Sequence, residues 1–291
     1  MKIALSFSEA LKLAIEQHRG GNYAHAESVL CGLARTKPGH ELVEDLLMQA
    51  LFNQGKTADA MARYDEAVGR GAYACPADFD AVYRRALIVT RYCPSPLARR
   101  AKFATLLAVL EPALALDGSA AECGCYRGLS TYLMLNRIRL HDPAYTGSGF
   151  HVFDSFAGLG APTSHDEIAA DHPNADNLRY MSRPGAFSAT LDEVRLALSE
   201  FPQVEYHPGW IPASFEGLPE RGYRFVHLDV DMHEPTRAAL EYFWPRIMRG
   251  GVIVCDDYGW PGARRAIEAY CAKERLDFSV TAHQQAVMTR R

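Results

Sequence analysis

From residue 120 onward, short runs of β-forming residues alternate with helical stretches, and several of the runs lead directly into an acidic residue. The runs cover residues 120–123, 150–153, 204–206, 225–228 and 252–255, and helical stretches cover residues 236–247 and 263–273. This alternation predicts an α/β fold with a mostly parallel sheet and helices on both faces. Residues 278–281 and 286–289 predict a closing hairpin.

The acids at the ends of these runs mark a functional crevice. In open parallel sheets, ligands bind beyond the carboxyl ends of the strands, because those ends meet along one edge. The acids that fall there are Glu122, Asp154, Asp229, Asp231, Asp256 and Asp257. We therefore expect a ligand site that brings several of them together.

The N-terminal part has a helical period and an internal repeat. Gly21, Tyr23, Ala26, Leu30 and Leu33 are followed 34 residues later by Gly55, Thr57, Ala60, Tyr64 and Ala67. This period resembles the tetratricopeptide repeat; the alternative is an ordinary pair of helical hairpins. Two units bury little apolar surface, so we expect them to pack on the rest of the chain or on a partner. The expected domains are residues 1–72 (small all-α, repeat-like), 73–118 (linker and cap helices) and 119–291 (α/β).

Composition excludes several classes of function. The net charge is -4, from 31 basic and 35 acidic residues, so a nucleic-acid partner is not expected. There is no signal-peptide pattern, and no apolar run is long enough to span a membrane. Seven scattered cysteines lack the paired CxxC spacing of a zinc site. We expect a cytoplasmic protein with cysteines in its core.

Residues 122–128 join the first strand to a helix through a glycine loop. The loop departs from the dinucleotide fingerprint, because Tyr126 stands where a second glycine would approach a pyrophosphate. A cofactor without phosphate, such as S-adenosylmethionine, would not need that glycine. Asp154 ends the second strand, where an acid commonly accepts hydrogen bonds from ribose hydroxyls. The alternatives are an ordinary strand-to-helix turn for the loop and a helix N-cap for Asp154.

Asp229, Asp231, Asp256 and Asp257 form the third constellation. Their strand ends, if adjacent, lie about 4.8 Å apart. So many carboxylates cannot all stay ionised without a counter-ion. Neither His227 nor His233 is expected to supply enough positive charge, whereas a Mg²⁺ ion suits an oxygen-rich site. The alternative is that some of these acids cap the helices that follow.

These segments together resemble the macrocin O-methyltransferase family, which methylates sugar hydroxyls of antibiotics. The matching segments are Glu-Cys-Gly-Cys-Tyr-Arg-Gly (122–128), Asp-Ser-Phe-Ala-Gly-Leu (154–159), Gly-Trp-Ile-Pro (209–212), His-Leu-Asp-Val-Asp (227–231) and Gly-Gly-Val-Ile-Val-Cys-Asp-Asp-Tyr-Gly (250–259). The resemblance implies a class I methyltransferase (Rossmann-like) fold, S-adenosyl-L-methionine and Mg²⁺. It departs at Ala157, Gly160 and Met232-His233, on the expected acceptor side.

The resemblance also implies roles for individual residues. The implied metal ligands are Asp229, Asp256 and Asp257, and Asp231 is the implied general base. The expected cofactor-binding residues are Glu122, Gly124, Arg127, Gly128, Asp154, Ser155, Phe156, Trp210 and Ile211. His233 is a second catalytic candidate, which could take the proton or hold the acceptor; an exposed histidine without a role is the alternative.

The leading hypothesis is therefore an S-adenosylmethionine- and Mg²⁺-dependent O-methyltransferase. Its expected partner is a small-molecule or glycan hydroxyl, with a homo-oligomer or protein contact through the N-terminal repeats. A catalytically silent methyltransferase-like scaffold that recruits a protein is the alternative from another class. A metal-dependent hydrolase is a third, which the Glu122 and Asp154 signals disfavour.

Overall fold

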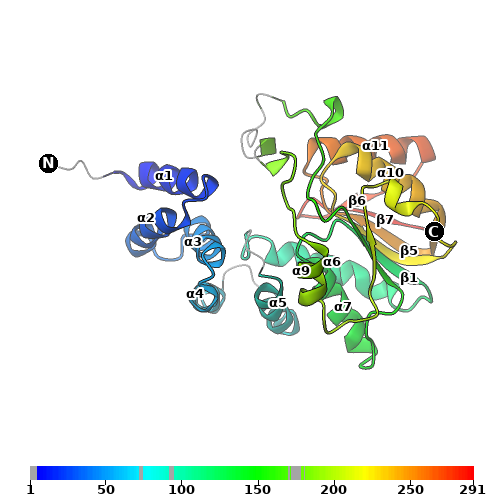
Figure 1. The fold of residues 1–291 in the computed structure, drawn as a ribbon, viewed down its shortest axis with the longest axis horizontal. Coiled ribbons are helices and arrows are strands. Elements are labelled where there is room, and N and C mark those ends of the chain that lie inside the picture. Colours follow the sequence, from blue (N-terminus) through cyan, green and yellow to red (C-terminus); the bar gives the residue numbers. More distant parts are fainter. Residues whose placement is uncertain (1–4, 72–74, 92–94, 170, 172–177, 180) are drawn as a thin grey trace. The chain divides into compact units, whose positions relative to one another are not determined.

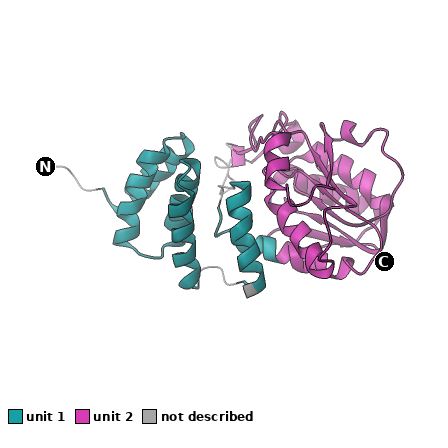
Figure 2. Ribbon diagram, turned by 60° about the horizontal axis from the view of Figure 1, so that its bottom comes forward, with its two compact units in different colours: residues 1–104 teal, residues 105–291 magenta. Residues whose placement is uncertain are grey.

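The computed structural model of the chain describes residues 5–71, 75–91, 95–169, 171, 178–179 and 181–291. The chain divides into two compact units, residues 1–104 and 105–291 (Figure 2). The expected boundary between residues 72 and 73 lies outside the described residues, and the expected linker is shared between the two units. The division into three domains that the sequence suggested stays a prediction.

The first unit is built from antiparallel helix pairs. Its helices are α1 (Phe7–Arg19), α2 (Tyr23–Thr36), α3 (Glu41–Asn53), α4 (Thr57–Gly69) and α5 (Ala77–Thr90), and α6 (Arg100–Ala113) begins in it. Gly21 and Gly55 occupy equivalent turns, with φ of +76° and +74°. Ala26 and Ala60, one per repeat, are both fully buried. The 34-residue period thus places matching residues in matching settings, while membership in the tetratricopeptide class stays a prediction.

The first unit also contains a buried acid, Asp45 on α3. Its carboxylate accepts hydrogen bonds of 3.0 Å from the backbone N–H of Leu97 and from the amide of Gln49. Burial raises the pKa of Asp45 to about 6, although these donors act in the opposite direction. The ionised side chain is therefore held in an environment that disfavours its charge.

The second unit contains a seven-stranded sheet with the order β3-β2-β1-β4-β5-β7-β6. The strands are β1 (Ser119–Cys123), β2 (Phe150–Asp154), β3 (Glu205–Pro208), β4 (Tyr223–Leu228), β5 (Ile247–Cys255), β6 (Ser279–Val280) and β7 (Ala286–Thr289). The first five are mutually parallel, and β7 is antiparallel to β5 and β6. The predicted strands and the closing hairpin are confirmed, with ends that shift by a few residues.

Helices cover both faces of this sheet, as the alternating pattern predicts. Figure 1 shows α10 (His233–Phe243) and α11 (Pro261–Glu274) on one face, and α6 with α7 (Leu129–His141) on the other. The other helices among the described residues of this unit are short: η1 (Ser164–Asp166), α9 (Leu191–Ala197), η2 (Ala213–Phe215) and η3 (Trp244–Arg246). Phe243 is fully buried, and Tyr242 and Trp244 are partly buried against the same core.

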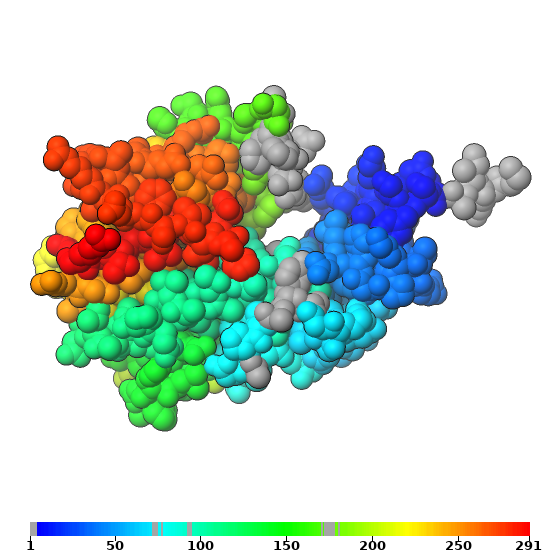
Figure 3. All heavy atoms as spheres, turned by 180° about the vertical axis from the view of Figure 1, so that it is seen from behind, coloured from blue at the N-terminus to red at the C-terminus, as the bar shows by residue number. Residues whose placement is uncertain are grey.

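The C-terminal hairpin of β7 and β6 forms the edge of the sheet opposite β3. In the space-filling view it lies at the surface, in red, beside the orange α11 (Figure 3). Because β1, β2, β4 and β5 are parallel, their carboxyl ends lie along the same edge of the sheet. The candidate site residues are found at that edge. Among the described residues, no helix combines the length and the apolar character needed to cross a lipid bilayer.

Candidate active site

The loop after β1 passes very close to the end of β4. Gly124 has φ of +81°, and a Cβ added there would lie 1.9 Å from the backbone oxygen of Asp229. Because that neighbour is backbone, no side-chain movement could relieve the overlap, and only glycine fits. The loop is also tied to both neighbouring strands, since Gly124 N–H donates to Phe153 and Asp229 N–H donates to Cys123, each over 2.8 Å. The predicted cofactor loop therefore lies directly beside a predicted metal ligand.

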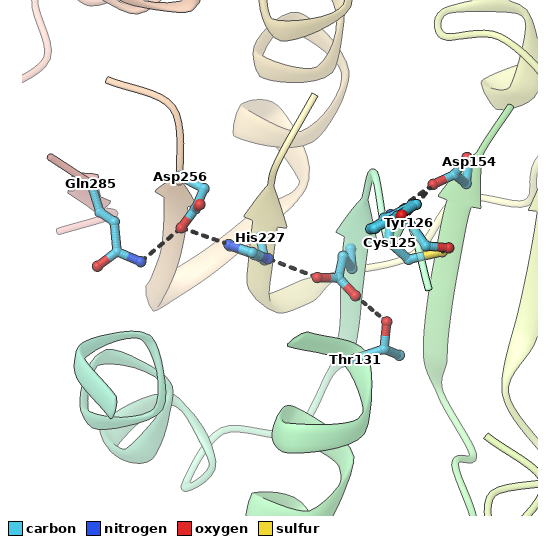
Figure 4. Close-up of polar contacts among 8 residues, drawn as sticks. Cys125, Tyr126, Thr131, Asp154, His227, Asp256 and Gln285 are labelled. Carbon is cyan, nitrogen blue, oxygen red and sulfur yellow. Dashed lines mark hydrogen bonds and ion pairs between the residues drawn. The ribbon is translucent and has the colours of Figure 1, made fainter. Parts of the chain in front are cut away.

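The carboxylate of Asp154 joins the loops that follow β1 and β2. Its Oδ2 accepts from the backbone N–H groups of Cys125 (2.7 Å) and Tyr126 (3.2 Å) (Figure 4), and its Oδ1 accepts from that of Phe156 (2.7 Å). Burial raises the pKa of Asp154, and the three N–H donors act against that rise. Asp154 thus closes an Asx turn and organises the cofactor loop, rather than capping a helix. Its contact with a ribose stays a prediction.

Ser155 and Phe156 form the turn after β2. The Ser155 hydroxyl donates to the carbonyl of Gly158 over 2.9 Å, and Phe156 has φ of +52°, which bulky residues rarely adopt. A Cβ at Gly158 would lie 2.4 Å from the carbonyl oxygen of Ala186. The turn is therefore fixed against the segment before α9, which keeps Ser155 and Phe156 next to Asp154.

The other predicted cofactor residues lie along the same edge. Gly128, with φ of +84°, is the residue directly before α7, and Arg127 precedes it. Trp210 is 51% exposed, whereas Ile211 packs against the core. The backbone N–H of Gly209, the residue before Trp210, donates to the carbonyl of Asp154 over 2.9 Å. The structure thus brings the Gly-Trp-Ile-Pro segment to the end of β2.

Glu122 lies inside the sheet domain. It is fully buried, and its carboxylate accepts hydrogen bonds from the hydroxyl of Thr131 on α7 and from Nδ1 of His227 on β4, the latter over 2.8 Å. Both carboxylate oxygens are therefore engaged by protein side chains. The assignment of Glu122 to the cofactor stays a prediction, and in this structure it has partners of its own.

His227 carries a positive charge between two carboxylates. Its Nδ1 contacts Glu122 and its Nε2 contacts Oδ1 of Asp256 over 3.4 Å, and none of the three is exposed by more than 1%. Burial alone would lower the pKa of His227, but the contacts with Asp256 and Glu122 outweigh it and raise the pKa to about 10. One imidazolium shared between Glu122 and Asp256 does not offset Asp229, Asp231 and Asp257, so the expectation that this histidine supplies too little charge stays a prediction.

A cluster of acids lies at the ends of β4 and β5. Asp229, Asp231 and Asp257 each place a carboxylate oxygen within 4.8 Å of the other two. Asp231, at φ of +57°, donates its backbone N–H to Oδ2 of Asp257 over 2.9 Å. Three converging carboxylates form an oxygen-only donor set, which suits a hard divalent cation such as Mg²⁺.

Asp256 belongs to a second group, with His227 and Asp229. Its Oδ1 also accepts from the amide of Gln285, just before β7, over 2.8 Å. Asp229 is common to both groups. Asp256 and Asp257, the other two metal ligands implied by the resemblance, therefore each lie near it. Among the described residues, Asp257 is grouped with Asp229 and Asp231, and Asp256 is not part of that group.

His233 begins α10 beside a segment that the sequence did not point to. Its backbone N–H donates to Oδ1 of Asp166 over 2.7 Å, and its ring stacks on that of His165 at 4.3 Å. Burial lowers the pKa of His233, and His165 lowers it further. Arg265 on α11 donates to the carbonyls of His165 and Glu167. The ring of His233 is thus packed against His165, and its backbone is tied to Asp166.

With this geometry in view, sequence comparison decides the family. The sequence profile of the macrocin O-methyltransferase family matches residues 99–291. The chain belongs to this family. The match starts at residue 99, so nearly all of the first unit lies outside it.

Curated relatives of the family are natural-product enzymes. The chain is 31% identical over 160 residues to 8-demethyl-8-(2,3-dimethoxy-alpha-L-rhamnosyl)-tetracenomycin-C 4'-O-methyltransferase of Streptomyces olivaceus, covering 53% of this chain and 58% of the relative. It is 28% identical to demethyldecarbamoylnovobiocin O-methyltransferase of Streptomyces niveus, covering 54% and 60%. It is 27% identical to mycinamicin III 3''-O-methyltransferase of Micromonospora griseorubida, covering 60% and 69%. The chain thus spans under two thirds of the length of the first two.

Solved structures confirm the class I methyltransferase fold. The O-methyltransferase NovP superposes with a TM-score of 0.55 at 21% identity, covering 69% of this chain and 85% of that one. The calicheamicin methyltransferase CalS11 superposes with a TM-score of 0.54 at 16% identity, covering 76% and 95%. At these identities the likeness concerns the fold alone.

Two site residues, Gln285 and Asp166, were missed by the sequence analysis, and His227 was considered there only as a source of charge. Its position two residues before Asp229, on the same face of an extended chain, is the signal for a structural role. Gln285 precedes the last strand and Asp166 lies in a long connection, and their partners are distant in the sequence. No local pattern marks either residue.

Proposed function

We propose that the chain is an S-adenosylmethionine- and Mg²⁺-dependent O-methyltransferase that acts on a sugar hydroxyl of a small molecule. One observation carries the proposal: the cofactor loop at Gly124 touches the backbone of Asp229, so a methyl donor on that loop would lie beside the acid cluster. Family membership supports methyl transfer as the reaction class. A silent scaffold would have no need of this arrangement.

The metal would be held by Asp229, Asp256 and Asp257, the residues that the family resemblance implies. All three are carboxylates, a donor type that suits Mg²⁺, and Asp229 lies within reach of both Asp256 and Asp257. Nε2 of His227 contacts Oδ1 of Asp256 over 3.4 Å. When bound, the ion would polarise the acceptor hydroxyl and stabilise the negative charge that develops on its oxygen.

Asp231 is the proposed general base. Its backbone is fixed by the hydrogen bond to Asp257, so its carboxylate has a defined position beside the other acids. The acceptor oxygen would take the methyl group of bound S-adenosylmethionine, whose carbon–sulfur bond electrons would pass to sulfur and leave S-adenosylhomocysteine. The hydroxyl proton passes to the Asp231 carboxylate.

The acceptor class rests on the relatives. Two of those named above methylate a glycosylated tetracenomycin and a mycinamicin, and the third acts on a novobiocin precursor. A deoxysugar or rhamnose unit on a natural product is the acceptor class we propose. Trp210, half exposed at the edge of the site, offers an aromatic surface on which such a ring could pack.

Methyl transfer tests this proposal directly. Isotope-labelled S-adenosylmethionine would be incubated with the full chain and a panel of rhamnosides and related glycosides, with Mg²⁺, with excess EDTA, and with Mg²⁺ restored. We expect label on a sugar oxygen, lost on chelation and recovered with the ion. Transfer that continues at full rate in metal-free protein, or that goes to nitrogen or carbon, would contradict the proposal.

A further inference from the structure

A continuous chain of buried side chains runs beneath the acid cluster. It links Thr131 on α7, Glu122 on β1, His227 on β4, Asp256 at the end of β5 and Gln285 before β7 (Figure 4). Each member comes from a different element, and each is exposed by 5% or less. This series of contacts therefore crosses the sheet inside the protein. Of its residues, only Asp256 belongs to the proposed metal site.

His227 is too deeply buried to touch a substrate or a cofactor. Its exposed fraction is zero, and its two nitrogens are directed to Glu122 and to Asp256. Removing a buried ring that contacts two buried carboxylates would leave both without this partner, which is costly. A residue in this position acts by fixing its neighbours, as the outer partners of metal ligands do.

We propose that His227 is a positioning residue for Asp256: anchored by Glu122, it holds Oδ1 of Asp256 together with Gln285, and so fixes how this acid is presented to a divalent cation. The inference rests on the proposed function, because it takes Asp256 as a metal ligand. It adds that affinity for the cation depends on the Nε2 side of His227, not on its Nδ1 side.

Two amide variants separate the two sides of the ring. The amide nitrogen of glutamine reaches about as far as Nε2, so His227→Gln keeps a donor for Asp256 and loses the one for Glu122. The amide nitrogen of asparagine lies near the Nδ1 position, so His227→Asn keeps the donor for Glu122 and loses the one for Asp256. Each variant loses one of the two ring contacts, so the two are compared with each other as well as with the wild type.

The readout is metal affinity rather than turnover. Mg²⁺, and Mn²⁺ as a second probe, would be titrated by calorimetry into the metal-free full chain. S-adenosylhomocysteine would be titrated in parallel to show that the Asp154 side is intact. We expect His227→Asn to bind the ion roughly 10- to 100-fold more weakly, the usual effect of losing such an outer partner. His227→Gln should bind it nearly as tightly as the wild type.

Gln285→Leu provides a second measurement, since it removes the other donor to the same oxygen. It should weaken metal binding in the same direction, and it carries the test if His227→Asn does not fold. Wild-type affinity in Gln285→Leu, or equal affinities in the two His227 variants, would overturn the positioning role and leave the proposed function standing. A wild-type chain that binds neither ion would overturn both.

Discussion

The backbone N–H of Asp231 donates a hydrogen bond of 2.9 Å to Oδ2 of Asp257. This bond ties the loop after β4 to the end of β5, and it uses no side-chain atom of Asp231. The carboxylate of Asp231 is therefore positioned by its own main chain beside the other two acids, where the proposed chemistry would take place. Substitutions of Asp231 can change that chemistry without cutting the tie.

Asp231 is the proposed general base, in the position that the family resemblance implies. Asp231→Asn should lower turnover roughly 10²- to 10⁴-fold, the usual contribution of a base, while binding cofactor and metal normally. His233→Ala should lose much less, because the hydrogen bond to Asp166 comes from its backbone and survives the change. Single-turnover rates on metal-loaded protein would rank the two. The reverse ranking would assign the general-base role to His233.

A matched pair of glycines tests the contact between the cofactor loop and β4. Gly124→Ala would place a methyl group 1.9 Å from the Asp229 carbonyl, whereas Gly217, at φ of +71°, has nothing within 4 Å of the added atom. Both variants carry the backbone strain of a left-handed residue, on the order of 1 kcal/mol. Gly217→Ala should show that cost only. Gly124→Ala should melt far lower and lose affinity for S-adenosylhomocysteine; equal melting temperatures would refute the close approach.

Asp45 predicts a pH dependence of stability in the first unit. Its pKa is raised from 3.8 to about 6, so the folded state binds its proton more tightly than the unfolded state. Its stabilising contribution is present in full below pH 3.8 and is lost as the pH rises through 6. The shift of roughly two units corresponds to about 3 kcal/mol.

The matched control for this prediction is Asp45→Asn, which does not titrate. Urea unfolding of both full chains between pH 4 and 8 should show the variant gaining on the wild type as the pH rises. A difference between the two that stays constant over this range would mean that Asp45 does not titrate as its burial requires.

The extent of the helical unit can be tested with fragments. Tyr64 on α4 donates to Asp80 on α5 over 2.9 Å, and its ring centre lies 6.1 Å from that of Tyr83. A fragment ending at residue 72 lacks these partners and exposes the fully buried Tyr64. We expect residues 1–104 to unfold cooperatively and residues 1–72 to unfold at a much lower temperature. Circular dichroism melts would decide, and a monomeric 1–72 fragment of equal stability would contradict this view.

Much of the sheet domain follows from local patterns. Runs that end at Asp154, Asp229 and Asp256 predicted strands because β-forming residues alternate there with helical stretches, and parallel strands must then meet at one edge. Gly124 was recognisable for the same reason, since a glycine after a strand permits close backbone approach. The family assignment rested on these segments and is confirmed.

The interior of the site could not be predicted. The partners of His227 lie 105 residues before it and 29 residues after it, so no sequence window shows that it stands between two carboxylates. The carboxylate of Asp154 accepts from backbone N–H groups, which every residue but proline carries and which leave no mark in a sequence. Asp166 reaches the start of α10 from a connection whose path is set by packing alone.

The most direct test of the account is a calorimetric titration of the full chain with S-adenosylhomocysteine, with and without Mg²⁺, alongside Asp154→Ala. Because Asp154 holds the cofactor loop and is the expected ribose contact, its loss should weaken binding roughly 10- to 100-fold. Asp277→Ala, at an acid whose side chain is 91% exposed, should change nothing. The account predicts saturable binding of S-adenosylhomocysteine by the wild type and of Mg²⁺ at the acid cluster. A wild-type chain that binds neither, or Asp154→Ala with unchanged affinity, would contradict it.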